Sequence, residues 1–252
     1  MKTTLLTFCA TLALALGVSL ALAQDRTEPK AEAPKTETKP EAKPEAEKPA
    51  GKDAAKEEVA EEAAPDFATI DKKAPDFTLK NAEGKEVKLS SFLGKIVVLE
   101  WTNYDCPFVK KHYAKSGNMP KLQKEQRQAG VVWLSICSSA KGKQGNFEGE
   151  ALLARIKKEN ADPAFYLVDD TSKVGRTYKA ATTPHMFVID AKGVLRYQGA
   201  IDSIASGKVE DIEKATNYVT QAIKALNDGK EVATKETKSY GCDTSSKFAV
   251  AN

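Results

Sequence analysis

The chain has 252 residues, of which 41% are hydrophobic and 29% are charged. Its 38 basic and 35 acidic residues nearly cancel, which excludes the strong positive field of a typical nucleic-acid binder. Two histidines leave little room for a multi-histidine metal site, and four cysteines in so long a chain exclude a disulfide-stapled miniprotein.

Residues 1–23 have the pattern of a secretory signal peptide. Lys2 precedes an apolar run, and Ala21 and Ala23 form an A-x-A cleavage pattern. The run of roughly 20 residues is also long enough to span a bilayer, so an uncleaved membrane anchor is the alternative. Cleavage would remove Cys9 and leave three cysteines in an exported protein, either periplasmic or extracellular.

Residues 24–65 are predicted to be a disordered linker. They consist almost entirely of Ala, Glu, Lys, Pro and Thr, with 12 acidic and 8 basic residues and no aromatic residue. Such a segment cannot bury enough apolar surface to offset its conformational entropy. Residues 66–252 are then expected to form one globular domain. Its net charge is +6, against +3 for the whole chain, because the linker is acidic.

The globular part alternates apolar strands with helical patterns. Lys95–Trp101 and Val131–Cys137 predict buried strands, and Met119–Gln128 between them predicts a helix. The later patterns predict a loop at Ser138–Phe147, a helix at Glu148–Asn160 and a strand at Phe165–Val168. They then predict a short helix at Ser172–Lys179, a hairpin at His185–Gln198 and a closing helix at Asp211–Asn227. This order predicts an α/β fold, with a mixed sheet covered by helices.

Cys106 is the main candidate for chemistry. It follows the first predicted strand, and Pro107 after it is favoured at the first position of a helix. Cys106 is therefore expected at a helix N-terminus, where unpaired N–H groups and the helix dipole favour a thiolate. Lys110 and Lys111 would add positive potential, and Asp105 would oppose it. A small buried cysteine at a helix start, without chemistry, is the alternative.

A proline at the entrance to a later strand makes this candidate more specific. Thr182 and Thr183 precede Pro184, which leads into the strand His185–Asp190. Proline removes a ladder hydrogen-bond donor there and suits the tight bend that a cis peptide bond makes. The cysteine and the proline together are far more specific than either residue alone.

With these features the chain resembles the thioredoxin superfamily, in its redoxin or peroxiredoxin-like (AhpC/TSA-like) branch. The resemblance covers residues 73–226 and rests on segments 74–79, 84–90 and 94–101, the turn Cys106-Pro107-Phe108-Val109-Lys110, segment 182–190 and Gly193. It implies a thioredoxin-like mixed β-sheet flanked by helices, and thiol chemistry at Cys106.

The active-site turn departs from the family pattern. Val109 stands where a thioredoxin has the second cysteine of its C-x-x-C motif, which leaves a single cysteine in that motif. Asn103 stands where a typical peroxiredoxin has threonine, and Pro184 stands in place of its arginine. These departures argue against ordinary peroxidase activity. The sequence is similar to a peroxiredoxin-like subgroup with a late Gly-Cys, here Gly241-Cys242.

Cys106 then needs a partner from elsewhere to cycle through a disulfide. Cys242 is the first candidate, because it lies in a turn-like tail long enough to fold back over the site. Cys137 ends the second predicted strand and is the other candidate. An unpaired tail cysteine and a buried strand-end cysteine are the respective alternatives, because pairing cannot be deduced from sequence.

The resemblance implies further roles around Cys106. Pro184 would shape the substrate groove and exclude metal, and Thr183 would offer backbone pairing to a substrate chain. Trp101 and Tyr104 would line the site, although a tryptophan at a strand end is more often part of the core. His185 beside the proline would tune Cys106, although one such histidine is more often structural.

We therefore expect an exported thiol-disulfide oxidoreductase. Cys106 would attack a disulfide or an oxidised thiol of a protein substrate or reductant, and Cys242 or Cys137 would resolve the mixed disulfide. One alternative is a thiol-dependent hydroperoxide reductase, an antioxidant enzyme in which Thr102 or Asn103 would orient the peroxide.

The second alternative is a non-enzymatic module that binds a protein or copper(I) through Cys106, Cys137 and His185. Their spacing matches no standard metal motif. We expect no cofactor, no metal and no nucleic acid, and a membrane only if the N-terminal segment is uncleaved.

Overall fold

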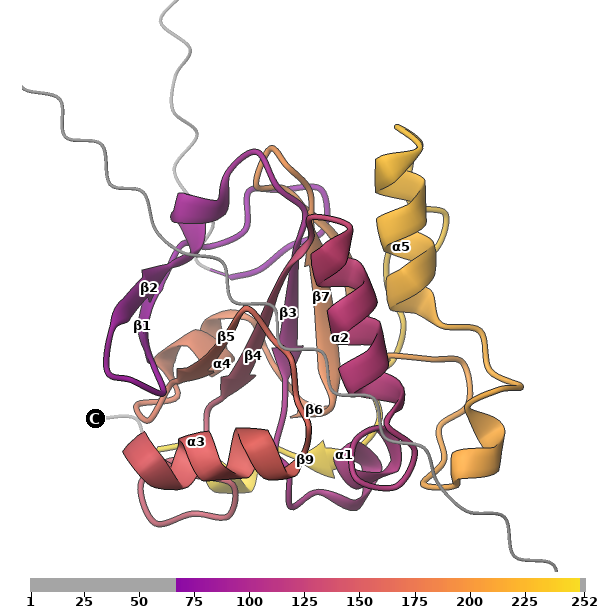
Figure 1. Cartoon of the computed structure of the whole chain (residues 1–252). Helices are drawn as coiled ribbons and strands as arrows, with labels where there is room; N and C mark the ends of the chain where they lie inside the picture. Colours follow the sequence, from indigo (N-terminus) through magenta and orange to yellow (C-terminus); the bar gives the residue numbers. More distant parts are fainter. Residues whose placement is uncertain (1–66, 250–252) are drawn as a thin grey trace, which may run out of the picture. The chain divides into compact units, whose positions relative to one another are not determined.

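Two apolar segments form the centre of a seven-stranded mixed sheet in the computed structural model, which describes residues 67–249 (Figure 1). β3 (Val97–Trp101) and β4 (Val132–Cys137) are parallel neighbours in which every residue is buried. Their largely apolar side chains pack on both faces of the sheet, as buried parallel strands do. The predicted signal peptide, the linker and the boundary at residue 66 lie outside the described residues.

The strand order is β2-β1-β5-β4-β3-β7-β8. The central β3, β4 and β5 are parallel, and β1, β2, β7 and β8 add to them in antiparallel pairs. The bounds of the outer strands are β1 Thr78–Asn81, β2 Glu86–Lys88, β5 Phe165–Val168, β7 His185–Ile189 and β8 Leu195–Gly199. A separate two-stranded sheet joins β6 (Thr182–Thr183) to β9 (Cys242–Asp243), far apart in sequence.

Helices cover both faces of the sheet, so the predicted mixed sheet flanked by helices is confirmed. Figure 1 shows α2 (Asn118–Gln128) and α5 (Tyr218–Asn227) side by side on one face. The other helices are α1 Pro107–His112, α3 Gly149–Lys158 and α4 Lys173–Thr177, with 3-10 turns η1 Leu89–Phe92, η2 Val209–Asp211 and η3 Ser245–Lys247. Within residues 67–249, no helix has the length and apolarity needed to cross a bilayer.

Side chains of β3 alternate between two cores. Val98 packs in the core beneath α1, α2 and α5. Val97 and Leu99 pack in the core on the other face, together with Tyr178 after α4. This alternation places residue 100 on the same face as Val98, beneath α1 and α2.

The closing helix is shorter than predicted. The expectation of a helix over Asp211–Asn227 is wrong for residues 211–217, because α5 begins only at Tyr218. Asn217 is the N-cap of α5, and its side chain accepts the N–H of Thr220 at 2.9 Å. Its extended backbone also forms an isolated bridge with Asp202. A residue held in this way starts a helix and cannot lie within one.

Candidate active site

Cys106 is the N-cap residue of α1, immediately beyond the carboxyl end of β3. Its backbone is extended, and its carbonyl accepts the N–H of Lys110 at 2.9 Å as the first helical hydrogen bond. Its own N–H donates to the Asn103 carbonyl at 2.9 Å. Pro107 occupies the start of the helix, where no hydrogen-bond donor is needed. The predicted placement of Cys106 at a helix start is confirmed.

Cys106 forms a disulfide with Cys242, and their Cα atoms are 6.0 Å apart. This separation lies in the usual range for a disulfide. Cys106 is completely buried, whereas Cys242 is partly exposed. The Sγ of Cys106 also lies 3.1 Å from the carbonyl oxygen of Thr183, which would accept its proton in the reduced thiol. The structure therefore brings together three residues that the sequence singles out.

The C-terminal strap, residues 229–249, carries Cys242 to this position. Within it, β9 pairs antiparallel with β6, so that Cys242 lies opposite Thr183. The Thr183–Pro184 peptide bond is cis. Figure 1 shows β6, β9 and α1 at the same end of the sheet. The edge at Thr183, expected to pair with a substrate chain, is paired here with the protein's own C-terminal segment.

Hydrogen bonds anchor the strap on both sides of Cys242. Before it, the Thr237 Oγ1 accepts the N–H of Ala200 at 2.9 Å, and the Tyr240 hydroxyl donates to Asp202 at 2.6 Å. After it, the Thr244 N–H donates to the Ala181 carbonyl at 3.1 Å. The strap is thus seated along its length and does not depend on the disulfide alone.

Cys137 is the free cysteine among residues 67–249, and it is buried at the end of β4. Its thiol donates to the Gly145 carbonyl at 3.3 Å. Burial raises the pKa of the Cys137 thiol, which keeps it protonated and weakly nucleophilic. In this structure Cys106 is bonded to Cys242, and Cys137 is unpaired.

Two of the charged residues expected to act on Cys106 are paired with other residues. The Asp105 carboxylate, expected to oppose a thiolate, is paired with Arg155 at 2.8 Å. Lys111, expected to add positive potential, is completely buried with its Nζ 3.6 Å from Asp202. Lys110 is partly exposed. Much of the opposing negative charge is thus offset by Arg155, and the Lys111 charge is directed toward Asp202.

Glu100 is a buried carboxylate that the sequence reasoning missed. It is completely buried in β3 and accepts hydrogen bonds from Tyr113 Oη at 2.8 Å and Trp133 Nε1 at 2.8 Å. Gln123 Nε2 and Ser135 Oγ also donate to it, each at 3.0 Å. Burial raises the pKa of Glu100, and these four donors oppose that rise. The available signal was an acidic residue inside a continuous apolar strand.

The two aromatic residues expected to line the site are buried in the core, and Trp101 also borders a small cavity next to Thr183. The Trp101 ring packs against Tyr178 and Phe187, with centroids 5.3 and 5.1 Å away, on the opposite face from Cys106. The Tyr104 ring packs edge-on against Tyr113, with centroids 5.0 Å apart, in the same core as Cys106. Both residues are 1% exposed, so neither offers a surface to a large substrate.

His185 is a structural residue in this arrangement. Its Nδ1 accepts the N–H of Ala181 at 3.2 Å, and its ring packs on Phe187. Burial lowers the pKa of His185 to about 4, so it is neutral at physiological pH. A neutral ring holding a loop fits the structural alternative better than tuning of Cys106.

A small cavity lies between β6 and the strap. Its volume is about 10 Å³, room for about one water molecule. The hydroxyls of Thr102 and Thr183 are buried beside it without a hydrogen-bond partner in the described part of the chain. Asn103 is already engaged, because its amide accepts the N–H of Asp105 and donates to the Gln144 carbonyl. The cavity is lined by Trp101, Thr102, Ser138, Ser139, Thr183, Thr244, Lys247 and Phe248.

A comparison with known families identifies the fold that carries Cys106. The model of the AhpC/TSA family matches residues 70–198, which is 129 of the 252 residues. The chain belongs to the AhpC/TSA family. It is a redoxin of the thioredoxin superfamily, a family of thiol oxidoreductases whose members act on thiol or disulfide substrates.

Two curated relatives agree with this assignment. The thioredoxin-like protein YneN of Bacillus subtilis is 27% identical over 126 residues, which are 50% of this chain and 68% of that protein. A probable phospholipid hydroperoxide glutathione peroxidase of Solanum lycopersicum is 32% identical over 98 residues, which are 37% of this chain and 55% of that protein.

Solved structures with the same fold cover more of the redoxin. A hypothetical protein from Sinorhizobium meliloti 1021 has a TM-score of 0.60 and 26% identity, over 73% of this chain and 96% of that one. An uncharacterised conserved protein from Geobacillus kaustophilus has a TM-score of 0.59 and 24% identity, over 74% and 95%.

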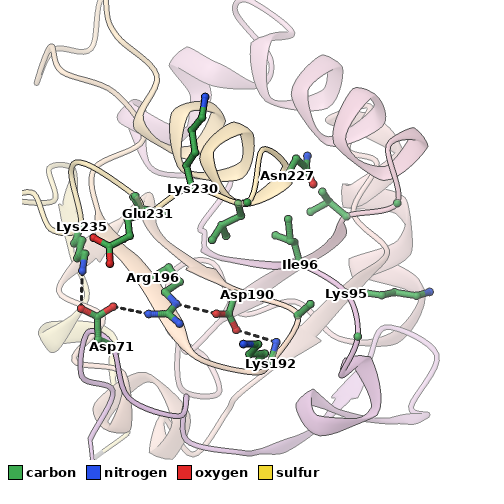
Figure 2. Close-up of a pocket in the computed structure, with 17 residues that line it drawn as sticks. Asp71, Lys95, Ile96, Asp190, Lys192, Arg196, Asn227, Lys230, Glu231 and Lys235 are labelled. Atoms are coloured by element: carbon green, nitrogen blue, oxygen red, sulfur yellow. Dashed lines mark hydrogen bonds and ion pairs between the residues drawn. The ribbon is translucent and has the colours of Figure 1, made fainter.

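A much larger hollow, of about 620 Å³, lies at the opposite end of β3 in the redoxin (Figure 2). Arg196 bridges Asp71 and Asp190 there at 2.8 Å each, and Lys235 of the strap pairs with Asp71 at 2.8 Å. None of the described residues that line it is a cysteine, histidine, serine or threonine. The described residues that line the hollow thus offer charge but no thiol, hydroxyl or imidazole.

Among residues 67–249, no three His, Cys, Asp or Glu side chains lie close enough together to hold a metal ion. Cys106, moreover, is bonded to Cys242, and the Nδ1 of His185 is occupied by Ala181. The described residues thus give no support to a copper site.

Proposed function

We propose that this redoxin is a thiol-disulfide oxidoreductase with Cys106 as nucleophile and Cys242 as resolving cysteine. The observation that carries the proposal is the disulfide between a helix N-cap cysteine and a cysteine on a separate, partly exposed strap. A helix start favours the thiolate, and a partner cysteine from elsewhere replaces the missing second cysteine of the turn.

The oxidising half of the cycle consumes a substrate disulfide. The Cys106 thiolate attacks one substrate sulfur, so that a mixed disulfide forms and the first substrate thiolate leaves. The Cys242 thiolate then attacks the Cys106 sulfur and releases the second substrate thiolate. The protein takes up the disulfide bond, and the substrate takes up two electrons.

Exposure sets the order of the reducing half. Cys106 is completely buried, whereas the Cys242 sulfur lies on the partly exposed strap. An external thiol therefore attacks Cys242, and Cys106 leaves as the thiolate. A second external thiol frees Cys242, so that two electrons return to the protein.

The compartment follows from the same chemistry. A structural or cycling disulfide persists outside the reducing cytosol, and residues 1–23 have the pattern of an export signal. We therefore propose that the enzyme works in the periplasm or outside the cell. Antibody detection of the mature protein in a periplasmic fraction, with the cleavage site read by N-terminal sequencing, tests this.

The decisive experiment compares three cysteine variants in a disulfide-exchange assay with insulin and dithiothreitol. Cys106→Ser should fall to the uncatalysed rate. Cys242→Ser should lose turnover but accumulate the mixed disulfide at Cys106. Cys137→Ala should stay within about twofold of wild type, because a buried, protonated thiol is a weak competitor. A Cys106→Ser protein as active as wild type would end the proposal.

A hydroperoxide reductase is the second candidate, favoured by the small cavity next to β6. Its two free hydroxyls, on Thr102 and Thr183, would hydrogen-bond a small oxidant, so that Thr102 is preferred to the engaged Asn103. The Cys106 thiol would take one peroxide oxygen as a sulfenic acid and release an alcohol. Cys242 would then form the disulfide and release water. The relative named as a glutathione peroxidase favours the same chemistry.

Trapping the intermediate tests this candidate. In the Cys242→Ser protein, one equivalent of hydroperoxide should produce a dimedone adduct at Cys106 within minutes, and adding Thr102→Val should slow its formation. Failure to form the adduct under conditions where the exchange assay is active would eliminate peroxidase activity and leave the exchange function.

A further inference from the structure

Tyr240 links the strap to the body of the protein two residues before Cys242. Its hydroxyl donates to Asp202 Oδ1 at 2.6 Å. Its ring packs edge-on against Phe108, with centroids 6.0 Å apart. Phe108 is two residues beyond Cys106 in the first turn of α1. The tyrosine therefore contacts the segment that carries one cysteine while it belongs to the segment that carries the other.

Asp202 is held rigidly beneath the strap. It is 4% exposed, and its Oδ1 also accepts the N–H of Ile204 at 3.1 Å. Its Oδ2 lies 3.6 Å from the Nζ of Lys111 and 3.8 Å from the Nε2 of His112, both on α1. The carboxylate thus joins α1 to the strap, with a cation on one side and a phenol on the other.

The Nζ of Lys111 has no hydrogen-bonding partner among the described residues. Its side chain is completely buried, and its Nζ lies 5.7 Å from the centre of the Tyr240 ring. A buried charge of this kind is costly unless it is paired. The ion pair with Asp202 and the face of the Tyr240 ring are its two compensating contacts. The cluster therefore has a preferred geometry, and Tyr240 completes it.

Gly241 carries the strap from this cluster to the cysteine. Its φ is +141°, in the region that favours glycine, and a Cβ at this position would lie 2.1 Å from the Thr183 carbonyl oxygen. Beyond Cys242, the Thr244 side chain donates to the Ala180 carbonyl at 2.5 Å. Cys242 is therefore held between two anchors, with the backbone in close contact with Thr183.

We propose that Asp202 is a positioning residue for the redox centre, acting through Tyr240. By fixing Tyr240, it favours the seated position of the strap when the disulfide is reduced, so that the Cys242 sulfur returns to within reach of Cys106 once a substrate has reacted there. The result is a higher effective concentration of one thiol at the other. This inference rests on the proposed use of Cys242 as the partner of Cys106.

The reaction affected is the closing of the disulfide. Oxidised dithiothreitol supplies the oxidising equivalents: the two protein S–H bonds break, one protein S–S bond forms, and dithiothreitol takes up both electrons and both protons. A strap that is already seated closes more readily, because less conformational freedom remains to be lost. Losing the anchor therefore lowers the equilibrium constant for oxidation of the protein.

The test measures this equilibrium in mixtures of reduced and oxidised dithiothreitol, by alkylation and mass spectrometry of the full chain. Tyr240→Phe keeps the ring on Phe108 and removes only the hydroxyl. It should lower the equilibrium constant roughly tenfold, which raises the reduction potential by about 30 mV. Asp202→Asn should act in the same direction. The matched control is Tyr218→Phe, whose ring packs on Tyr197, and it should change the constant less than twofold.

The outcomes separate this inference from the proposed function. Tyr240→Phe with the same equilibrium constant as wild type would overturn the positioning role and leave the disulfide chemistry intact. Wild-type protein that forms no Cys106–Cys242 disulfide would overturn both. If Asp202→Asn fails to fold because Lys111 loses its partner, Tyr240→Phe decides the matter, because it leaves that ion pair in place.

Discussion

At one end of β3 the strap closes over a disulfide and leaves room for about one water molecule. At the other end an open hollow of about 620 Å³ is lined by charged side chains. Within residues 67–249, the small, closed end has the disulfide and two hydroxyls without hydrogen-bond partners, whereas the large end has ion pairs but no thiol or hydroxyl side chain in its lining. The size of a hollow therefore does not identify the reactive site here.

The same strap reaches both ends. Lys235 pairs with Asp71 in the large hollow, and seven residues later Cys242 is bonded to Cys106. The contacts differ in kind: the Lys235 pair is partly exposed, whereas Asp202 beneath Tyr240 is buried. We expect changes at the buried end to affect the redox equilibrium far more than changes at the exposed end.

The largest contrast concerns turnover. Cys106→Ala should lower the exchange rate at least roughly 100-fold, because the nucleophile is lost. Arg196→Gln breaks the ion pairs with Asp71 and Asp190 in the large hollow, and it should change the rate less than about twofold, because the hollow lies at the opposite end of β3 from Cys106. Initial rates of insulin reduction measure both. A strong loss in Arg196→Gln would move the active site toward the large hollow.

Acid stability should distinguish the two ends next. Burial lowers the pKa of His185 to about 4, from an ordinary 6.5. The unfolded state therefore binds more protons between these values, and stability falls as the pH drops from 6.5 to 4. The loss at pH 5 is about 2 kcal/mol for this histidine. Burial also lowers the pKa of His112, so His112 adds to the loss of stability in acid. Burial raises the pKa values of Glu100 and Asp169, and their effect on stability has the opposite sign.

Replacing His185 isolates its contribution to the loss of stability in acid. Urea unfolding of oxidised His185→Asn at pH 7 and pH 5 should show a loss about 2 kcal/mol smaller than that of wild type. Asp71, in the large hollow, has its pKa lowered by hydrogen bonds from Lys235 and Arg196. It should therefore lose its favourable contribution only below about pH 4. Equal pH dependence in His185→Asn and wild type would contradict the assignment of a buried neutral ring.

Two glycines of the strap provide a matched pair for the redox equilibrium. Gly241→Ala would place a methyl group against the Thr183 carbonyl, and it should lower the equilibrium constant for disulfide formation roughly tenfold. Gly229→Ala has a positive φ of 66° but open space around it. It should cost about 1–2 kcal/mol of folding stability for the backbone strain alone. Its redox equilibrium should stay within twofold of wild type.

The smallest effect is expected where the strap meets the large hollow. Lys235→Ala removes the pair with Asp71, which involves two substantially exposed side chains. The disulfide equilibrium should be unchanged within twofold, because exposed pairs are weak and screened by salt. A tenfold change would show that the two ends of the strap are energetically coupled.

Strong local signals made the centre of the fold predictable. β3 and β4 are nearly continuous apolar runs, which favour burial on both faces of a sheet, and Pro107 marks the start of α1. The closing helix was overextended because its apolar periodicity continued past Asn217, whose capping role depends on a bridge with the distant Asp202. Periodicity reports burial along a segment but not where a tertiary contact interrupts it.

The site was harder to predict because much of it depends on long-range contacts. Cys242 could be proposed as a partner, yet nothing in the strap's polar sequence indicates that it forms β9 beside Thr183. Lys111 and Glu100 were unexpected because charged side chains are rarely buried, and each is paired by groups from other elements. The cluster around Asp202 joins residues 111, 202 and 240, which no local pattern connects.

Cys106 and Cys242 are 136 residues apart, so their disulfide closes most of the described domain into a covalent ring. In the chain-entropy model, a ring of this size restricts the unfolded chain enough to stabilise the fold by about 5 kcal/mol. That is a large share of the roughly 5–15 kcal/mol typical of a whole domain. Each catalytic turnover would thus open and close the ring, and the protein would be most exposed to proteases while it is reduced.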